Sequence, residues 1–420
     1  MTKTEETVSS VEETSLKDLV LTLKVEKNVL IDSLRKVNSC VGKFANDKHF
    51  DLAKMRCEEH GVSFYTYDGQ CSLTLTNSRI ETNNIDFECV FNPKLLLGGL
   101  NGMRDCTLEL TINSENIEIV EKTSQQKQSS RHVSIPVMAG DQIVDSKIDA
   151  HASEHYVTKP MKFTDFIDTF KNVSEFSATD ESRPILAGDH LFVKNSQLYI
   201  EATDARRAIR LASNFDINSI ACVSADDQPI DQDKWKSSFN SFNLVVDAGY
   251  FKKLEKVFSD DDIVIAEIYK NGIQITSNSE NPCSFTTNSL VGSYPNMDRF
   301  FLLQESNVEI NCSFLQLNDA VNTFIRTTKN NKDKQTCITV DSNTLTLNTN
   351  ARATVQFKIA VDVSSNLSNF KIYVNSDYLG DLLKCCRLET AVFCVTDPLK
   401  PLYLKVKKDE YGLITPLRVN

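Results

Sequence analysis

The chain has 420 residues, a formal net charge of −11 and 25% charged side chains, and its overall composition is ordinary for a soluble globular protein. Its length predicts about three domains, and its acidic balance argues against a conventional nucleic-acid-binding domain, which usually carries a basic excess. No apolar run approaches the ~20 residues of a membrane helix, and residues 1–17 lack the apolar segment of a signal peptide. We therefore expect a cytoplasmic protein whose residues 1–17 form a disordered acidic tail.

Alternating apolar and polar residues predict strands along most of the chain, with amphipathic helical patterns between them. The helical patterns place apolar residues three and four positions apart, as in a helix that packs on a sheet. We expect six helices, at residues 28–41, 93–100, 163–176, 250–258, 314–325 and 378–386. The clearest strands are residues 72–75, 107–112, 197–200, 272–275 and 402–406. Clusters of Asn, Asp and Gly between such strands predict hairpin turns.

A short pattern occurs three times and divides the chain. In each copy an alternating strand is followed by Thr, then Asn or Asp, then a small residue and Arg, at residues 73–79, 198–206 and 345–352. One copy would indicate only a turn, because Asn and Asp side chains bond the local backbone. Three copies, each between two predicted helices, indicate a triplicated α+β domain of two helices and about eight strands. We expect these domains at residues 18–152, 153–304 and 305–420.

The residue types that carry catalysis or bind metals do not form a recognisable site. None of the twelve cysteines belongs to a Cys-x-x-Cys pair, so we expect reduced thiols that act as small core residues. His151 and His155 could be a metal pair, and Asp260 begins a run of three Asp, but a zinc site needs three or four ligands. A solvated linker and a turn explain these residues better. The sequence also lacks the glycine-rich motifs that bind phosphates and the Gly-x-Ser-x-Gly motif that carries a nucleophilic serine. We therefore expect no cofactor, no metal and no enzymatic activity.

Five strings in the second and third domains, in the same order, resemble the bacterial DNA polymerase III β subunit, the β sliding clamp family: residues 176–188, 198–207, 292–300, 374–379 and 413–419. The similarity covers essentially residues 18–420. The family usually has Thr-Asp-Gly-His-Arg where residues 203–207 read Thr-Asp-Ala-Arg-Arg. Its Met-containing C-terminal signature is here Thr-Pro-Leu-Arg-Val, at residues 415–419. The resemblance therefore indicates a divergent clamp, with a partner preference that could differ from the family's.

The resemblance implies a head-to-tail homodimer whose six domains close a ring around duplex DNA without reading its sequence. In the family, helices line the hole and a sheet forms the outside, so basic helix residues would face the DNA. The candidates are Arg35, Lys36, Lys43, Lys171, Lys252, Lys253, Lys256, Arg326 and Lys384. A modest cationic lining suits a ring that holds DNA topologically, because tight phosphate contacts would oppose sliding. A solvated helix face is the alternative for each of these residues.

Dimer closure would join the third domain of one subunit to the first domain of the other. By position, the candidates are Phe324 and Ile325 in the fifth predicted helix, and Val133 and Ile135 in a strand near the end of the first domain. Ordinary core packing is the alternative for these apolar side chains.

The resemblance also implies a surface pocket between the second and third domains that binds short peptides from a DNA polymerase, the clamp loader and other proteins. Apolar walls would bury peptide anchors, while Arg207 and Arg418 would hold carbonyl or carboxylate groups. A plain turn at Pro295 and core packing at Leu417 are the alternatives. The residues matched to the family pocket are Leu186, Thr203, Arg206, Arg207, Ala208, Pro295, Arg299, Phe300, Asn375, Tyr378, Leu399, Pro401, Leu413, Thr415, Pro416, Leu417 and Arg418.

The sequence therefore predicts a non-enzymatic DNA sliding clamp that tethers the replicative polymerase to duplex DNA. Because tethering makes each rebinding event intramolecular, a weak peptide contact suffices. Two alternatives stay open. One is a metal-dependent hydrolase that uses the regions of His151 and Asp260, and the other is a clamp-fold structural or inhibitor protein that does not encircle DNA.

Overall fold

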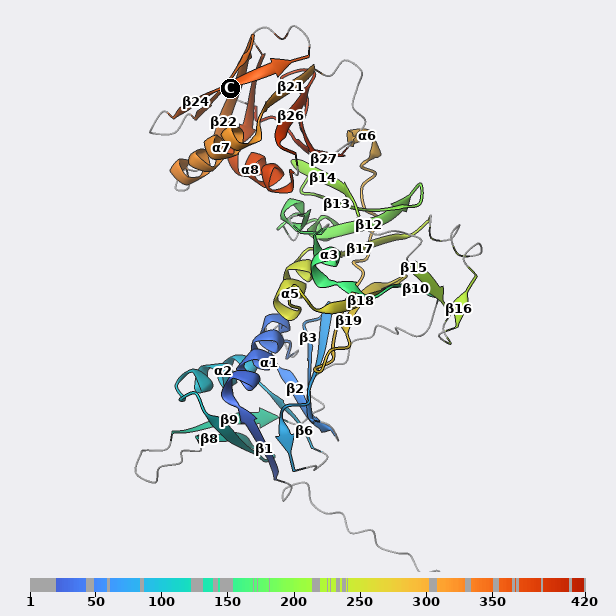
Figure 1. Ribbon diagram of the computed structural model, residues 1–420, viewed down its shortest axis with the longest axis vertical. Helices are drawn as coiled ribbons and strands as arrows, with labels where there is room; N and C mark the ends of the chain where they lie inside the picture. The colour runs from blue at the N-terminus through green and yellow to red at the C-terminus, as the bar shows by residue number, and fades with distance from the viewer. Residues whose placement is uncertain are drawn as a thin grey trace, which may run out of the picture. The chain divides into compact units, whose positions relative to one another are not determined.

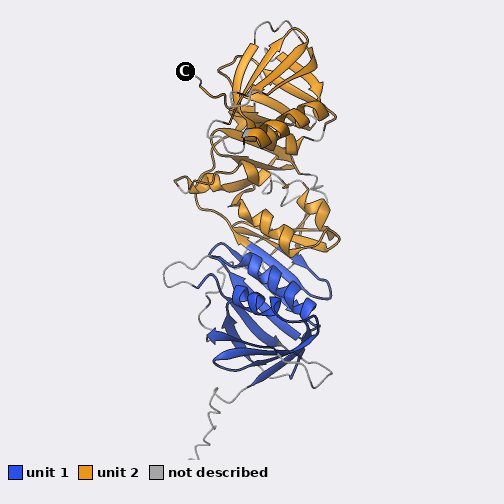
Figure 2. Ribbon diagram, turned by 90° about the vertical axis from the view of Figure 1, so that its left-hand side faces the viewer, with its two compact units in different colours: residues 1–147, 275–286 blue, residues 148–274, 287–420 orange. Residues whose placement is uncertain are grey.

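The computed structural model divides into two compact units, one of residues 1–147 and 275–286 and the other of residues 148–274 and 287–420 (Figure 2). Antiparallel sheets covered by a few helices build both units (Figure 1), in agreement with the predicted α+β class. The structure describes residues 20–42, 49–58, 61–83, 87–121, 131–138, 143, 154–168, 170–171, 173–180, 182–213, 220–224, 226, 228–231, 235, 239, 241–301, 308–328, 334–349, 355–364, 367, 370–386, 388–407 and 410–418.

The first unit is an antiparallel sheet with two helices, α1 (Lys27–Cys40) and α2 (Pro93–Asn101). The helices contact each other, and α1 also packs on β3 and β4. Within the unit the strand order is β4-β3-β2-β6-β9-β8-β7-β1-β5. The strands are β1 (Leu21–Glu26), β2 (Ala53–Glu58), β3 (Gly61–Tyr67), β4 (Cys71–Asn77), β5 (Glu81–Thr82), β6 (Glu88–Phe91), β7 (Thr107–Ile112), β8 (Asn116–Glu121) and β9 (His132–Met138).

The second unit contains a long sheet with the strand order β17-β12-β13-β14-β28-β27-β26-β21-β24-β23-β22-β25. Its strands are β12 (Gly188–Lys194), β13 (Gln197–Thr203), β14 (Arg207–Ala212), β17 (Asn243–Asp247), β21 (Val308–Ser313), β22 (Gln335–Asp341), β23 (Thr344–Thr349), β24 (Gln356–Val363), β25 (Phe370–Asn375), β26 (Thr390–Val395), β27 (Leu402–Lys407) and β28 (Glu410–Ile414). One continuous ladder thus joins the predicted second and third domains through the pairing of β14 with β28.

Shorter strands form the rest of the second unit, in the order β16-β15-β10-β18-β19, with β11 beside β18. These are β10 (His155–Thr158), β11 (Met161–Lys162), β15 (Ile220–Val223), β16 (Pro229–Ile230), β18 (Ile263–Tyr269) and β19 (Gly272–Ser277). The end of β19 and most of β20 (Cys283–Asn288) belong to the first unit. The helical segments are α3 (Phe163–Ile167), η3 (Val173–Phe176), η4 (Pro184–Ala187), α5 (Gly249–Val257), α6 (Asp298–Phe301), α7 (Phe314–Thr328) and α8 (Ser376–Cys385).

Five of the six predicted helices are confirmed, as α1, α2, α5, α7 and α8, because each has one apolar stripe that the sheet buries. In α1, for example, Leu30, Leu34 and Val37 are buried at helical spacing. No helix in the described part of the chain is long and apolar enough to cross a membrane.

The third predicted helix, residues 163–176, is wrong as one continuous α-helix. The α-helical part ends at Ile167, and a 3₁₀ segment occupies Val173–Phe176. Between them the backbone N–H groups of Phe170 and Val173 bond to carbonyls three residues earlier (3.0 and 3.2 Å), and the N–H of Lys171 bonds to the carbonyl four residues earlier (2.8 Å). A 3₁₀ path has three residues per turn, and it suits buried apolar residues that recur at every third position, namely Ile167, Phe170, Val173 and Phe176.

The order of elements supports the internal repeat, but the first copy of the sequence pattern lies one strand too late. The second copy ends β13, which pairs with β12, and β12 pairs with β17 on its other side. The first unit has the same arrangement as β6-β2-β3-β4. The counterpart of β13 is therefore β3, whereas residues 73–79 lie on β4 and the turn that follows it.

The turn after β3 shows the same geometry as the turn after β13. Asp68 Oδ1 accepts hydrogen bonds from the backbone N–H groups two and three residues ahead (2.9 and 2.7 Å), and Asp204 Oδ1 does the same (2.9 Å for both). The next residue in each turn, Gly69 or Ala205, has a left-handed φ of +98° or +69°. The first copy is therefore centred on Asp68, and the turn of the third copy, residues 350–352, lies outside the described residues.

A second repeated device begins the later helix of each domain. Asp247 and Asn375 end a strand and Asn92 directly follows one, and each accepts a hydrogen bond from the backbone N–H two residues ahead (2.8, 2.9 and 3.0 Å). Such side chains satisfy N–H groups that have no partner within the helix. The sequence analysis did not single out these residues, although Asn or Asp before a helical pattern was a usable signal.

The cysteines confirm the prediction of small core residues. Eleven of the twelve side chains are buried and Cys106 is half-buried, all as free thiols. Burial raises the pKa of the Cys89 and Cys312 thiols to about 12, so both stay protonated at neutral pH.

Candidate functional site

The turn between β13 and β14 lies at the centre of the candidate site. Thr203 Oγ1 donates a hydrogen bond to the carbonyl of Arg207 (2.7 Å) and accepts one from the N–H of Ala205 (3.1 Å). Together with the Asp204 carboxylate, these bonds fix the turn. They leave Arg206 exposed to solvent, whereas the side chain of Arg207 is only 11% exposed.

An apolar cavity of about 230 Å³ opens beside this turn. Thirteen residues line it, from η4, the β13–β14 turn and its flanking strand residues, the segment around α6, the residue before β27, and the end of β28 with the residue after it: Leu186, Thr203, Ala205, Arg206, Arg207, Ala208, Pro295, Met297, Arg299, Phe300, Pro401, Leu413 and Thr415. Eleven of these belong to the predicted pocket, and the structure brings them together from the second and third predicted domains. Ala205 and Met297 were missed, although Ala205 is next to Arg206 and Met297 lies two residues from both Pro295 and Arg299.

The floor of the cavity is a small buried cluster of Ala208, Met297 and Leu413. Ala208 and Leu413 face each other across the pairing of β14 with β28. The Thr415 N–H and hydroxyl both donate to the carbonyl of Arg206 (2.8 and 2.9 Å), which continues the contact beyond the strand. The cavity is therefore built on the ladder that joins the two domains.

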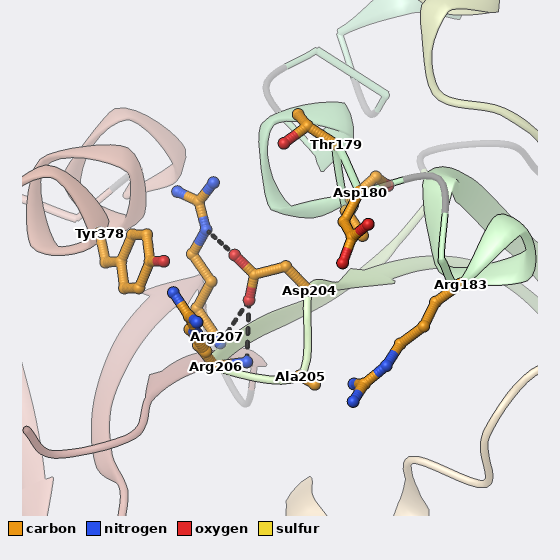
Figure 3. A pocket seen from close by; sticks show the side chains of 10 residues that line it. Thr179, Asp180, Arg183, Asp204, Ala205, Arg206, Arg207 and Tyr378 are labelled. Atoms are coloured by element: carbon orange, nitrogen blue, oxygen red, sulfur yellow. Dashed lines mark hydrogen bonds and ion pairs between the residues drawn. The ribbon is translucent and has the colours of Figure 1, made fainter.

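A larger and more polar hollow, of about 560 Å³, adjoins the cavity, because Ala205, Arg206 and Arg207 line both. Its remaining lining residues are Ser177, Ala178, Thr179, Asp180, Arg183, Asp204 and Tyr378. Figure 3 shows Tyr378 on one side of the arginines and Asp180 and Arg183 on the other. A hydrogen bond with the Tyr378 side chain raises the pKa of Arg206.

Arg207 links three elements through its guanidinium. Its Nε donates to Asp204 Oδ2 (3.1 Å). One terminal nitrogen donates to Asp381 of α8, and the other to the backbone carbonyl of Glu175 in η3. The charge of Arg207 is therefore matched by carboxylates of the protein itself.

The two faces of the Arg207 guanidinium are also occupied. Its carbon lies 5.1 Å from the ring centroid of Phe176 and 4.5 Å from that of Tyr378. Because rings and hydrogen-bond partners surround it, Arg207 holds η3, β14 and α8 together. These contacts give Arg207 a structural role, its predicted contact with a peptide group stays a prediction, and Arg206 is the exposed guanidinium of the turn.

A charged network fixes the part of the cavity wall that is formed by α6 and by the residues just before it in the chain. Arg210 of β14 donates to Glu201 Oε2 and to Asp298 Oδ1, both at 2.7 Å. Hydrogen bonds from Arg210 and Lys194 hold the pKa of Asp298 below its usual value, so it stays ionised. His190 Nδ1 lies 2.8 Å from Glu201 Oε1 and extends the network to β12. Sequence analysis missed this network, because its members are up to 108 residues apart.

Six predicted pocket residues do not line the cavity: Asn375, Tyr378, Leu399, Pro416, Leu417 and Arg418. Tyr378 lines the larger hollow instead, and Asn375 caps α8. The Leu417 N–H donates to the carbonyl of Tyr373 (2.7 Å), which anchors the C-terminal segment. Leu399 is 80% exposed, in the loop between β26 and β27. A role for these six in peptide binding stays a prediction.

Most of the predicted DNA-facing residues lie on helices: Arg35 and Lys36 on α1, Lys252, Lys253 and Lys256 on α5, Arg326 on α7 and Lys384 on α8. Lys171 lies between α3 and η3, and Lys43 lies outside the described residues. Four of them pair with carboxylates, as Arg35–Asp32 (3.7 Å), Lys171–Glu255 (3.5 Å), Lys252–Glu175 (2.9 Å) and Lys384–Asp381 (2.7 Å). The described helices carry ten Lys and Arg against eight Asp and Glu, a slight excess in a chain of net charge −11.

The predicted dimer-contact residues need one correction. Phe324 is fully buried and packs edge-on against Phe357 of β24, with ring centroids 5.4 Å apart. It is therefore a core residue of its own domain rather than an interface residue. Ile325 and Val133 are half-buried, and Ile135 is 8% exposed. A dimer contact by these three stays a prediction.

The residues considered for a metal site have other surroundings. His155 is buried in β10, where its ring stacks on Tyr269 with centroids 4.8 Å apart, so its predicted place in a solvated linker is wrong. The carboxylate of Asp262 accepts a bond from the Ser259 N–H (2.8 Å), as expected for a turn. His151 lies outside the described residues, within which no group of three His, Cys, Asp or Glu is placed to hold a metal ion.

Comparison with known proteins identifies the same fold. No family model matches the chain. The β sliding clamp of Bacillus subtilis (strain 168) is 22% identical over 411 residues, which cover 94% of this chain and 98% of the relative. The structure of a Bartonella birtlesii sliding clamp (DNA polymerase III subunit β) bound to griselimycin matches with a TM-score of 0.76 at 16% identity, over 95% of this chain and 100% of that one. A DNA polymerase III β chain from Streptococcus pneumoniae matches with a TM-score of 0.74 at 18% identity, over 96% and 100%. The chain therefore has the fold of the bacterial β sliding clamps, the DNA polymerase III β subunits.

Proposed function

We propose that the protein is a DNA sliding clamp. It is a non-enzymatic homodimer that encircles duplex DNA in the cytoplasm and tethers the replicative polymerase and other DNA-processing proteins through a peptide pocket. Each chain contributes three clamp domains, at residues 18–152, 153–304 and 305–420, to a ring of six. The pairing of β14 with β28 carries the proposal, because the same junction, repeated between subunits, closes the ring.

Two strand edges support this closure. By position in the repeat, the last strand of the first domain is β9 and corresponds to β28, and β24 corresponds to β14. Among the described residues, 132–136 of β9 pair only with β8, and 356–360 of β24 pair only with β23. An open strand edge is a template for pairing with another chain. A head-to-tail dimer would join these two edges, with Val133 and Ile135 on one side and Phe357 on the other.

An exposed leucine on α2 supports the same contact. At the junction within the chain, Tyr378 of α8 lies three residues after the capping residue Asn375 and stacks on Arg207. The residue three positions after the equivalent cap, Asn92, is Leu95, which is 53% exposed. Burying such a side chain contributes about 1.5–3 kcal/mol. We infer that Leu95 packs against the partner subunit, as Tyr378 packs within the chain.

The helix charges suit topological retention of DNA rather than tight binding. Four of the basic side chains are already paired with carboxylates, which lowers the net positive charge available to neutralise phosphates. Binding through phosphate contacts weakens steeply with salt, whereas a closed ring stays on circular DNA at any ionic strength that leaves the dimer intact. The proposal therefore requires a ring, and not a basic surface.

The apolar cavity gives the ring its attachment point for partners. At about 230 Å³, it is smaller than the ~300–1,000 Å³ pockets that enclose drug-sized ligands. It suits one or two apolar side chains of a short peptide. A weak contact of this kind is sufficient, because a partner tethered on the same DNA rebinds at high effective concentration.

Native mass spectrometry tests the ring. The expected result is a dimer of twice the 47.3 kDa chain mass. Leu95→Asp should shift the protein to monomers, because a carboxylate would be buried without a partner at the contact. Leu315→Asp is the matched control, since Leu315 is exposed on α7 (72%) at its start and should leave the dimer intact. A wild-type monomer at micromolar concentration, or a stable Leu95→Asp dimer, would contradict this account of closure.

A further inference from the structure

We propose that Asp189 is a pH-sensitive switch that controls the opening of η3. A protonated Asp189 keeps η3 closed against β12, and an Asp189 that has lost its proton to water favours an open segment in which the carboxylate is hydrated. The switch acts on the polar hollow beside the β13–β14 turn, because Ser177, the residue that directly follows η3, lines it.

The carboxyl group of Asp189 attaches η3 to β12 from inside the second unit. The Asp189 side chain is fully buried, and its two oxygens accept hydrogen bonds from the hydroxyls of Ser174 (2.5 Å) and Ser177 (2.7 Å). Both serines are buried as well. One carboxyl group therefore holds the segment at two points, and water reaches it only when η3 moves away.

The hydroxyl of Ser177 can serve both protonation states of Asp189. It lies 2.7 Å from Asp189 Oδ1 and 3.2 Å from the carbonyl oxygen of Gly188. When Asp189 is ionised, Ser177 donates its proton to the carboxylate. When Asp189 is protonated, its O–H donates to Ser177, which then donates to the Gly188 carbonyl. The neutral form therefore keeps its hydrogen bonds, whereas the ionised form places a charge in the interior.

The charges that face Asp189 do not offset this cost. Asp247 of β17 repels a second negative charge, and Lys252 of α5 attracts one. Lys252 also pairs with the carboxylate of Glu175 in η3 (2.9 Å), so its charge is shared. Burial raises the pKa of Asp189 to about 6, because it outweighs the two serine hydrogen bonds.

The other titratable groups beside β12 leave that balance unchanged. Tyr294, just before α6, is uncharged, because burial raises the pKa of its phenol. Glu201 of β13 is bonded by His190 (2.8 Å) and Arg210 (2.7 Å), so these charges compensate one another. The short segment η4, Pro184–Ala187, has no titratable side chain.

Opening of η3 relieves the buried carboxylate. The usual pKa of Asp is 3.8, against about 6 in the closed segment, so loss of the proton favours opening. From these two values, the opening constant should rise about tenfold between pH 5 and 8. Opening also withdraws support from Arg207, which donates to the Glu175 carbonyl and lies 5.1 Å from the ring centroid of Phe176.

Hydrogen exchange of the full-length protein tests the switch without DNA or a partner. The N–H groups of Val173, Ser177 and Ala178 bond to backbone carbonyls (3.2, 3.4 and 2.7 Å), so peptic fragments that contain them report opening. Exchange is followed by mass spectrometry from pH 5 to 8, and each rate is divided by the intrinsic rate at that pH. Wild type is compared with Asp189→Asn, Ser177→Ala and Asp168→Asn. The last variant is the matched control, because it removes an exposed carboxylate directly after α3 in the same unit.

The wild type and Asp168→Asn should open about tenfold more at pH 8 than at pH 5, and Asp189→Asn should change by less than about twofold. Ser177→Ala should keep the rise but move its midpoint to higher pH, because the carboxylate loses a donor that lowers its pKa. Four results would overturn the switch: a pH-independent wild type, a rise that persists in Asp189→Asn, an unchanged midpoint in Ser177→Ala, or exchange of η3 only together with β13.

Discussion

Replacing Arg207 with Ala would remove the side chain that joins β14, α8 and η3. Its side chain is 11% exposed, and the guanidinium donates to Asp204, Asp381 and the carbonyl of Glu175. Each carboxylate keeps another partner, because Asp204 also accepts from two backbone N–H groups and Asp381 from Lys384 (2.7 Å). The variant therefore loses the contacts that join the three elements, but it leaves neither carboxylate buried without a partner.

The contacts set the size of the effect. A hydrogen bond to a charged group contributes about 1.5–3 kcal/mol, and each of the two ring contacts, with Phe176 and Tyr378, adds about 0.5–1 kcal/mol. The ~3–5 kcal/mol penalty for breaking a buried ion pair does not apply in full, since both carboxylates keep partners. We expect the free energy of unfolding of the second unit to fall by about 2–4 kcal/mol.

Urea unfolding followed by the fluorescence of Trp235 measures this loss. Trp235 is the single Trp, is 3% exposed and lies in the second unit, with its ring 5.6 Å from that of Phe239. Arg206→Ala is the matched control: it removes the neighbouring, exposed Arg and should change stability by less than about 0.5 kcal/mol. Equal midpoints for the two variants, with peptide affinity lost in Arg207→Ala, would show that Arg207 contacts peptide and does not hold the junction.

Two further predictions concern stability. Burial raises the pKa of Asp189 to about 6, so the folded state holds this proton more tightly than the unfolded chain. The group contributes stability below about pH 4 and loses it as pH rises through about 6, a difference of roughly 3 kcal/mol. The urea midpoint of the Asp189→Asn variant should therefore rise relative to that of the wild type as pH increases from about 4 to 7. A difference between the two midpoints that does not change with pH would contradict the assignment. A Cβ on Gly412 would lie 2.1 Å from Cδ2 of the fully buried Leu382, so Gly412→Ala should cost about 1–3 kcal/mol. Gly98→Ala meets no atom within 4 Å in α2 and should stabilise by about 0.5–1 kcal/mol; similar midpoints for the two glycine variants in thermal unfolding would refute this packing argument.

The sequence predicted those elements whose burial follows the helical or strand period. Five helices were placed within a few residues, because each has a single apolar stripe. The third failed because apolar residues from Ile167 to Phe176 recur every three residues, which fits a 3₁₀ path as well as an α-helix. The first repeat copy was misplaced because residues 73–79 imitate the pattern, whereas the true turn at Asp68 has Gly-Gln where the later copies have Ala-Arg.

The candidate site was predicted through family resemblance, and its details required the fold. Matching to the family by position placed eleven residues around one cavity, because the strands that carry them follow the order of the repeated domains along the chain. It could not show that Arg207 is neutralised, since Asp381 lies 174 residues away in the chain. Nor could it show that Phe324 is a core residue, because a buried and an exposed Phe look alike on an amphipathic helix. Partners distant in sequence decide both cases.

Retention on circular DNA tests the central claim most directly. Subunits are diluted until they separate, concentrated with a nicked circular plasmid so that rings close in its presence, and gel-filtered in high salt. We expect the protein to stay with the circle and to leave it after a restriction enzyme cuts the plasmid, while Leu95→Asp is never retained. Loss from the circle as fast as from linear DNA, or retention that survives cutting, would contradict a topological link.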